Sequence, residues 1–156
     1  MAVPPQDHTE YDLVHVRAGP WRADRPRTAS LLQLDFEFEG ASLDLEAARE
    51  RRRAVDRHGI TALIVPARYR TAGTGLDEAM RRATDATRAA GAELRSEPTR
   101  FHSDHPMYFT FLVPASEPEG PASSALGGLL VSVDKCDGHI WTEQEMRAYF
   151  ELIGSR

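Results

Sequence analysis

Apolar and polar side chains alternate most regularly in the segment 31–39, Leu-Leu-Gln-Leu-Asp-Phe-Glu-Phe-Glu. This two-residue period predicts a β-strand with one buried face and one solvated, acidic face. Shorter apolar runs predict further strands at 11–17, 60–66, 92–97, 107–113 and 129–134. The run at 60–66 is almost continuously apolar, so we expect that strand to be buried on both faces.

Three other segments have the spacing of helices. Ser42 or Asp44 can cap a helix that runs to about residue 58. The apolar spacing predicts a second helix over 76–90 and a third over 143–153. The order of these elements favours an α+β fold, in which about three helices pack on a mixed, mainly antiparallel sheet.

The chain has 156 residues, 41% of them hydrophobic, which is the size of one ordinary domain with a buried core. We expect a single domain over 11–156. It is preceded by a loose arm over 1–10, which carries two prolines and no periodicity. The segment 114–125 is rich in Pro and Ser and predicts a flexible loop between two strands.

The net charge of −5 gives no general attraction to nucleic acid or to anionic membranes, whereas it suits a basic protein partner. The first ten residues lack the features of a signal peptide, and no apolar run is long enough to cross a bilayer. The single cysteine excludes an internal disulfide. We therefore expect a soluble, cytoplasmic protein that binds neither nucleic acid nor membrane. The preference for Arg and Ala over Lys indicates a bacterial source.

The segment Arg70-Thr-Ala-Gly-Thr-Gly75 follows a predicted buried strand and precedes a predicted helix. It resembles the acyl-CoA-binding loop of GCN5-related N-acetyltransferases, in which backbone amides at a helix N-terminus hold the pyrophosphate. The resemblance covers about thirty residues and implies that Arg70, Gly73 and Gly75 bind an acyl-CoA. In the alternative interpretation the two glycines relax a loop and Thr74 caps the helix.

A second group of candidate residues is His102, Asp104 and His105, which offer two imidazoles and a carboxylate within four positions. These are the ligand types of a two-histidine, one-carboxylate metal site. The same residues are also ordinary turn chemistry before a strand, and no established metal-binding spacing is present. We therefore expect no metal and no other cofactor.

The polar face of the strand at 31–39 carries Asp35, Glu37 and Glu39. Three carboxylates on one side of a strand form a general-base cluster, an acidic binding surface or simply a solvated sheet face. No nucleophile accompanies them, because Cys136 has no neighbouring base beyond His139. We take these carboxylates as a candidate binding surface.

The segment 133–145, Val-Asp-Lys-Cys-Asp-Gly-His-Ile-Trp-Thr-Glu-Gln-Glu, combines acidic residues, a histidine and the cysteine. Its first and last carboxylates have the spacing of an EF-hand loop, but the turn glycine stands one position too early and a cysteine occupies the third position. We predict a hairpin turn at Asp137-Gly138 and a helix N-cap at Thr142, with Glu145 as its capping-box partner.

The segments 107–113 and 129–141 are similar to the C-terminal part of YrhB-like bacterial immunity proteins. In that family a small α+β domain binds and neutralises a cognate toxin, so the resemblance implies a protein partner. Our leading hypothesis is therefore a small cytosolic binding protein without catalytic activity, whose partner is another protein of basic character.

Two alternatives stay open. One is an acyl-CoA-dependent, N-acetyltransferase-like enzyme that uses the loop at 70–75. The other is a small-molecule enzyme or binding protein with a pocket between helices and sheet, lined by Tyr69, Phe101, Tyr108 and Phe111. Core packing explains the same aromatic residues.

Overall fold

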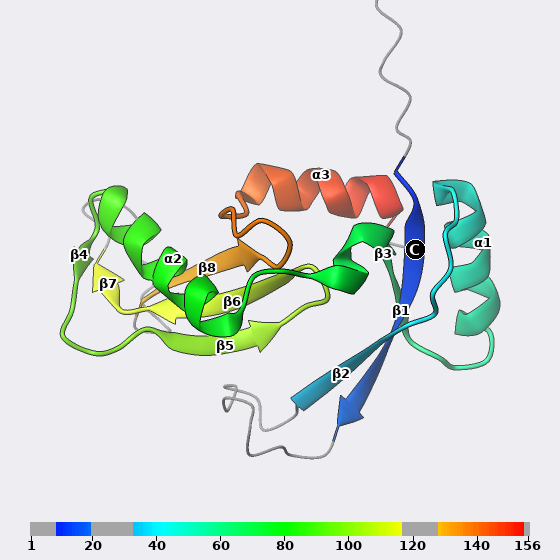
Figure 1. Cartoon of the computed structure of the whole chain (residues 1–156), viewed down its shortest axis with the longest axis horizontal. Helices are drawn as coiled ribbons and strands as arrows, with labels where there is room; N and C mark the ends of the chain where they lie inside the picture. Colours follow the sequence, from blue (N-terminus) through cyan, green and yellow to red (C-terminus); the bar gives the residue numbers. More distant parts are fainter. Residues whose placement is uncertain (1–8, 20–32, 117–127, 155–156) are drawn as a thin grey trace, which may run out of the picture.

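The computed structural model describes residues 9–19, 33–116 and 128–154. Residues 1–8 of the predicted arm at 1–10, most of the predicted loop at 114–125 and the start of the strand at 31–39 lie outside these ranges. The described chain has the α+β fold that the element order predicts, with antiparallel pairing throughout its sheets (Figure 1).

The described strands form three small antiparallel sheets. The first sheet has the order β2-β1-β3, with β1 at Tyr11–Gly19, β2 at Gln33–Phe38 and β3 at Ala62–Pro66. The second pairs β4 (Glu93–Leu94) with β7 (Ala115–Ser116). The third has the order β5-β6-β8, with β5 at Arg100–Asp104, β6 at Tyr108–Val113 and β8 at Leu129–Asp134.

Three α-helices and one 3₁₀ helix accompany these sheets. They are α1 (Leu45–Asp56), η1 (Ala67–Thr71), α2 (Leu76–Ala89) and α3 (Glu143–Ile153). Helix α1 covers the first sheet, α2 covers the third sheet, and α3 extends between the two sheets (Figure 1). No helix in the described ranges combines the length and the apolar character that a membrane crossing requires.

The first hydrophobic core lies between the first sheet, α1 and α3. Leu13, Val14 and Ile64 of the sheet are fully buried, and Tyr149 and Ile153 of α3 pack against them. The hydroxyl of Tyr149 donates a hydrogen bond to the backbone carbonyl of Ile64. The apolar face of α3 therefore docks on β3, which fixes the position of that helix.

The second core lies between α2 and the third sheet. Ala79 and Ala83 are fully buried on the inner face of α2, and they pack in one cluster with Phe111, Val113 and Val133. Small residues on this face of the helix let its backbone come close to the sheet. The regular alanine spacing of the segment 76–90 thus has a packing role.

Arginines of α1 stabilise the C-terminal end of α3. The guanidinium of Arg49 donates to the carbonyls of Leu152 and Ile153, and Arg52 donates to the carbonyl of Gly154 at 2.8 Å. The last carbonyls of a helix lack partners within the helix and carry partial negative charge, so these cations satisfy them. These two arginines therefore form contacts between α1 and α3.

Candidate functional site

Asp134, at the end of β8, is a buried carboxylate that joins several parts of the chain. Its side chain is 1% exposed. One carboxylate oxygen accepts hydrogen bonds from the backbone amides of Cys136 at 2.7 Å and Asp137 at 3.1 Å. The other accepts from the hydroxyl of Tyr69 and, at 2.9 Å, from the indole nitrogen of Trp141. These four donors satisfy the carboxylate, which is the condition for burying it.

The four bonds give Asp134 two structural roles. The two backbone bonds shape the turn that follows β8, where Gly138 has a φ of +75° and Val133 bridges to Ile140. This confirms the hairpin turn predicted from the Asp-Gly step. The two side-chain bonds join β8 to η1, which follows the first sheet, and to the segment before α3. Asp134 therefore links the two main sheets.

Burial and hydrogen bonding also change the pKa of Tyr69. Burial and the bond to Asp134 raise the pKa of its phenol well above the ordinary value. A phenol that donates to a buried carboxylate keeps its proton at neutral pH. It is therefore a poor general base, and its role is that of a fixed donor.

His139 lies beside this turn, between two carboxylates. Its Nδ1 is 2.5 Å from Oδ1 of Asp137, and its Nε2 is 2.8 Å from Oε2 of Glu145 on α3. Burial alone would lower the pKa of His139, but these bonds outweigh it and raise the pKa above its ordinary value. Glu145 thus binds His139, while Thr142 caps α3 by accepting from the amide of Glu145 at 3.0 Å. The predicted N-cap is confirmed.

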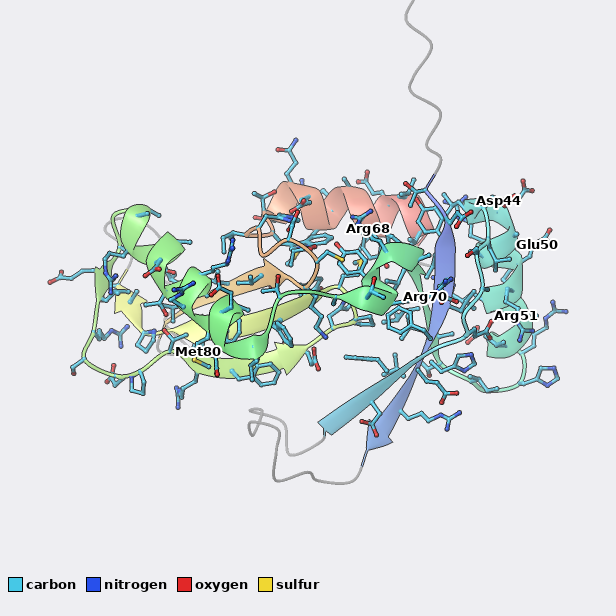
Figure 2. All side chains as sticks on the ribbon, viewed as in Figure 1. Asp44, Glu50, Arg51, Arg68, Arg70 and Met80 are labelled. Carbon is cyan, nitrogen blue, oxygen red and sulfur yellow. The ribbon has the colours of Figure 1, made fainter. Side chains whose placement is uncertain are left out.

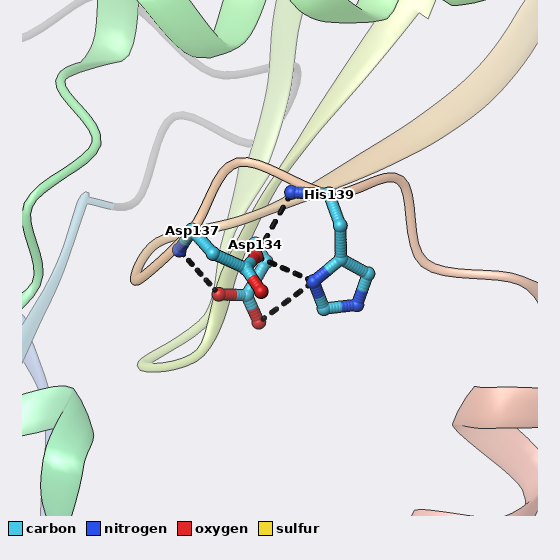
Figure 3. A group of neighbouring side chains, drawn as sticks. All are labelled: Asp134, Asp137 and His139. Atoms are coloured by element: carbon cyan, nitrogen blue, oxygen red, sulfur yellow. Dashed lines mark hydrogen bonds and ion pairs between the residues drawn. The ribbon is translucent and has the colours of Figure 1, made fainter.

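Asp134, Asp137 and His139 offer three potential metal-binding atoms within 4.8 Å of one another (Figure 3). Each of these atoms already has a partner. Both oxygens of Asp134 accept hydrogen bonds, and Nδ1 of His139 contacts Asp137. An ion would have to displace the bonds that hold the turn and the sheets together, so the arrangement is better suited to a structural cluster than to a metal centre.

Cys136 shows no sign of activation. Burial and the nearby charge of Asp134 raise the pKa of its thiol above the ordinary value. Its sulfur lies 3.6 Å from the backbone carbonyl of Arg68. A nucleophilic cysteine needs a lowered pKa, which requires a nearby positive charge or base that outweighs these effects.

The residues of the loop at 70–75 lie at the junction between η1 and α2. Arg70 points toward β1 (Figure 2), where its Nε is 2.6 Å from Oδ2 of the fully buried Asp12. The amide of Thr74 donates to the carbonyl of Lys135 at 2.8 Å, and Gly73 lies close to the backbone of Cys136. Gly75 is the N-cap of α2 and provides no side-chain cap. The loop thus packs on the turn after β8, and Arg70 has a buried counter-ion.

The residues His102, Asp104 and His105 do not converge. Oδ1 of Asp104 forms an ion pair with Nζ of Lys135 at 2.6 Å. Nδ1 of His105 accepts from the amide of Met107 at 3.1 Å, and its ring stacks on Tyr108. Burial, followed by the charge of Lys135, lowers the pKa of His105 to about 4. His105 is therefore a neutral, packed histidine at physiological pH.

The candidate binding carboxylates, Asp35 and Glu37 of β2 and Glu39 directly after it, face cations of the same chain. Glu39 is bonded to His15 at 2.8 Å and to Arg51 at 3.2 Å, and its side chain is only 16% exposed. Glu37 is exposed, and its Oε2 lies 3.5 Å from Nη2 of Arg17. Asp35 stands opposite Arg17 in the strand register. Opposite charges that face each other across paired strands stabilise the sheet, so this face has a structural explanation.

The four aromatic residues proposed to line a pocket do not line one common cavity. Phe101 and Phe111 belong to the second core, with ring centroids 6.0 Å apart. Tyr108 stacks on His105 and contacts Trp141, 5.3 Å between centroids. Tyr69 does line a cavity, of about 430 Å³, which lies between η1, the start of β1 and α3.

Two residues that the sequence analysis did not identify prove to be central. Asp12 is buried in β1 and accepts from the amides of Gly40 and Ala41, at 3.1 and 3.0 Å, as well as from Arg70. Lys135 places its ammonium 5.2 Å from the ring centroid of Phe36 in the first sheet and 4.5 Å from that of Phe109 in the third. The only sequence signal for Asp12 is a carboxylate inside an apolar strand. Lys135 gives no such signal.

Comparisons with models of protein families, with curated proteins and with solved structures gave no match to this chain. The residues and contacts described above are therefore the basis for any functional assignment.

Proposed function

We propose that this protein is a binding protein without catalytic activity, and that its partner is another protein. The observation that supports this proposal is that the side chains considered as candidates for catalysis form hydrogen bonds and ion pairs within the fold. Asp134 holds two elements and a turn, Arg70 balances Asp12, and Asp104 pairs with Lys135. A catalytic group needs a free lone pair or proton near a substrate, and these groups are already satisfied.

The outer surface of α3 supports a protein partner better than the carboxylates of β2 do. Phe150 and Leu152 are large apolar side chains of this helix that are 44% and 41% exposed. Between them in the sequence is the exposed Glu151, and Glu143 at the start of the same helix is 88% exposed and pairs with Arg147 at 3.2 Å. Large apolar side chains among carboxylates suit a partner surface that combines apolar and basic groups.

This chemistry agrees with the resemblance to immunity proteins, which act by binding a toxin and need no reaction of their own. We therefore propose an immunity-type role for a cytoplasmic bacterial protein with a basic partner. In this proposal the partner binds the exposed surface of α3, and β2 has a structural role only.

Crosslinking from α3 tests the proposal. A photoreactive phenylalanine at position 150 is compared with one at position 60, because Ile60 is similarly exposed (41%) and lies outside α3. We expect position 150 to crosslink one protein in cells of the source organism and position 60 not to. Absence of any crosslinked protein at position 150, or equal yields at both positions, would contradict the proposal.

Binding of the identified partner is then measured with purified variants. Phe150→Ala and Glu151→Lys should each weaken the affinity about tenfold, and the affinity should fall with ionic strength. Glu37→Lys is the matched control, because Glu37 is an exposed carboxylate of β2. Loss of binding in Glu37→Lys alone would instead place the interface on β2.

The acyl-CoA alternative has a separate test. If the loop at 70–75 held a pyrophosphate, millimolar acetyl-CoA would raise the melting temperature of the protein. Because Arg70 is bound to Asp12 and the amide of Thr74 is bound to Lys135, we expect no shift. A clear, saturable shift that is absent in Gly73→Val would favour the acyltransferase over the binding protein.

A further inference from the structure

The cavity between α3 and η1 combines an apolar wall with a charged rim. Its volume of about 430 Å³ is within the range of pockets that hold small ligands. The wall includes Met107, Trp141, Tyr149 and Leu152. Trp141 is partly exposed and Leu152 is 41% exposed, so apolar surface is accessible to a ligand there.

Arg68 supplies the positive charge of the rim. Its guanidinium lies 4.9 Å from the centroid of the Tyr69 ring, with one nitrogen 3.5 Å from the Tyr69 hydroxyl oxygen. Because that hydroxyl donates its proton to Asp134, its oxygen is free to accept from Arg68. The buried Tyr69–Asp134 pair therefore positions the guanidinium beside α3 (Figure 2).

Among the described residues, no carboxylate lies within 4.0 Å of the Arg68 guanidinium. The acidic group on the same rim, Glu145, has both oxygens within 3.0 Å of Nε2 of His139 and is balanced by it. Asp134 is buried beneath Tyr69 and Trp141. The described residues of the rim thus offer one cation, Arg68, that reaches a carboxylate only through the Tyr69 hydroxyl, beside an apolar wall.

We infer that this cavity binds a small monocarboxylate with a flat apolar body. The carboxylate would pair with the Arg68 guanidinium, whose planar donors match a carboxylate. The apolar body would lie against Trp141 and Leu152. Glu145 lines the same cavity, and its negative charge disfavours a ligand with two negative charges, so a single carboxylate is preferred over a phosphate. This inference goes beyond the proposed protein partner, although Leu152 belongs both to this cavity and to the exposed surface of α3.

Calorimetry and NMR with naphthalene-2-carboxylate test the inference. The neutral isostere 2-naphthamide has the same shape and lacks the charge. We expect saturable binding of the carboxylate at submillimolar concentration, with a shift of the Trp141 indole signal, and at least tenfold weaker binding of the amide. No binding at millimolar concentration, or equal affinities for the two compounds, would overturn the inference.

Two variants and a control locate the site. Arg68→Gln should abolish the difference between carboxylate and amide, and Ala148→Phe should block both compounds by filling the cavity, which Ala148 lines. Arg53→Gln removes an exposed arginine of α1 and should leave binding unchanged. Unaltered binding in Arg68→Gln, with its fold verified by circular dichroism, would refute the role of that residue.

The same binding measurement with a short peptide whose C-terminal residue is phenylalanine tests whether the carboxylate is that of a polypeptide terminus. Tighter binding of this peptide than of its C-terminal amide and of naphthalene-2-carboxylate would assign the same carboxylate chemistry to a polypeptide terminus. Weaker binding of the peptide would support a small-molecule ligand.

Discussion

Replacing Asp134 by asparagine tests the structural role of its carboxylate with almost no change in shape. The carboxylate accepts four hydrogen bonds, two on each oxygen, and asparagine keeps only one oxygen. If the side-chain NH₂ of the asparagine faces η1, it meets the indole N–H of Trp141. If the NH₂ faces the turn, it meets the backbone N–H groups of Cys136 and Asp137. Both orientations place a donor against a donor that has no alternative acceptor.

The magnitude follows from those lost bonds. One of the four bonds cannot form if the NH₂ group faces η1, and two cannot if it faces the turn, while the remaining bonds lose a charged acceptor; a buried donor left without a partner costs about 1–3 kcal/mol. Relaxation of the turn lowers this cost, so we expect Asp134→Asn to reduce the free energy of unfolding by about 2–4 kcal/mol. Such a loss is a large part of the stability of a domain of this size.

Urea unfolding at pH 7, followed by circular dichroism, measures this loss. The matched control is Asp137→Asn, which makes the same chemical change on a side chain that is 67% exposed and three residues away. The control should lose less than about 1 kcal/mol. A loss below about 0.5 kcal/mol in Asp134→Asn, or equal losses in the two variants, would refute the reasoning.

Three further predictions concern single contacts. Arg70→Gln leaves the buried carboxylate of Asp12 without its cation and should cost about 2–4 kcal/mol in urea unfolding. Thr142→Ala removes the cap of α3 and should cost about 1 kcal/mol, measured in the same way. The pKa of His105 is about 4 in the folded protein, compared with 6.5 for an unperturbed histidine. As the pH falls below 6.5, His105 is therefore protonated in the unfolded state before it is protonated in the folded state. Between pH 6.5 and 4 the unfolding free energy should therefore decrease by up to about 3 kcal/mol, and His105→Phe should flatten this slope while the exposed His58→Phe does not.

Each of these three predictions has a contradicting result. Arg81→Gln is the control for Arg70, because Arg81 pairs with Glu78 on the surface of α2. Equal losses in the two arginine variants would show that Asp12 does not need its counter-ion. A Thr142→Ala variant as stable as the native chain would exclude a contribution from the cap. An unchanged pH slope in His105→Phe would place the responsible group elsewhere.

The positions of the helices and of most strands could be predicted because their signals are local. The N-caps at Asp44 and Thr142 and the turn at Gly138 are set by residues within a few positions of each other. The split into three sheets could not be predicted, because it depends on pairing between strands far apart in sequence. The alternation of apolar and polar residues shows which face of a strand is buried, but it does not show which other strand pairs with it.

Strand β5 shows why a polar edge strand is misinterpreted. Its sequence, Arg-Phe-His-Ser-Asp, lacks clean alternation and has a register shift between Phe101 and Ser103, so its residues suggest a metal site. Pairing with β6 provides the missing stabilisation, which the local sequence does not contain. In the same way the cluster around Asp134 depends on Tyr69, 65 positions away, and no local pattern identifies that partner.

The central claim is that the polar residues of the turn after β8 hold the two main sheets together. Hydrogen exchange of native protein and of Asp134→Asn, resolved by residue, tests this claim most directly. We expect the variant to exchange faster in η1 and at the end of β3 as well as in the turn at 134–141, while Asp137→Asn exchanges faster only near the turn. Faster exchange confined to residues 134–138 in both variants would contradict the claim, because Asp134 would then stabilise only its own turn.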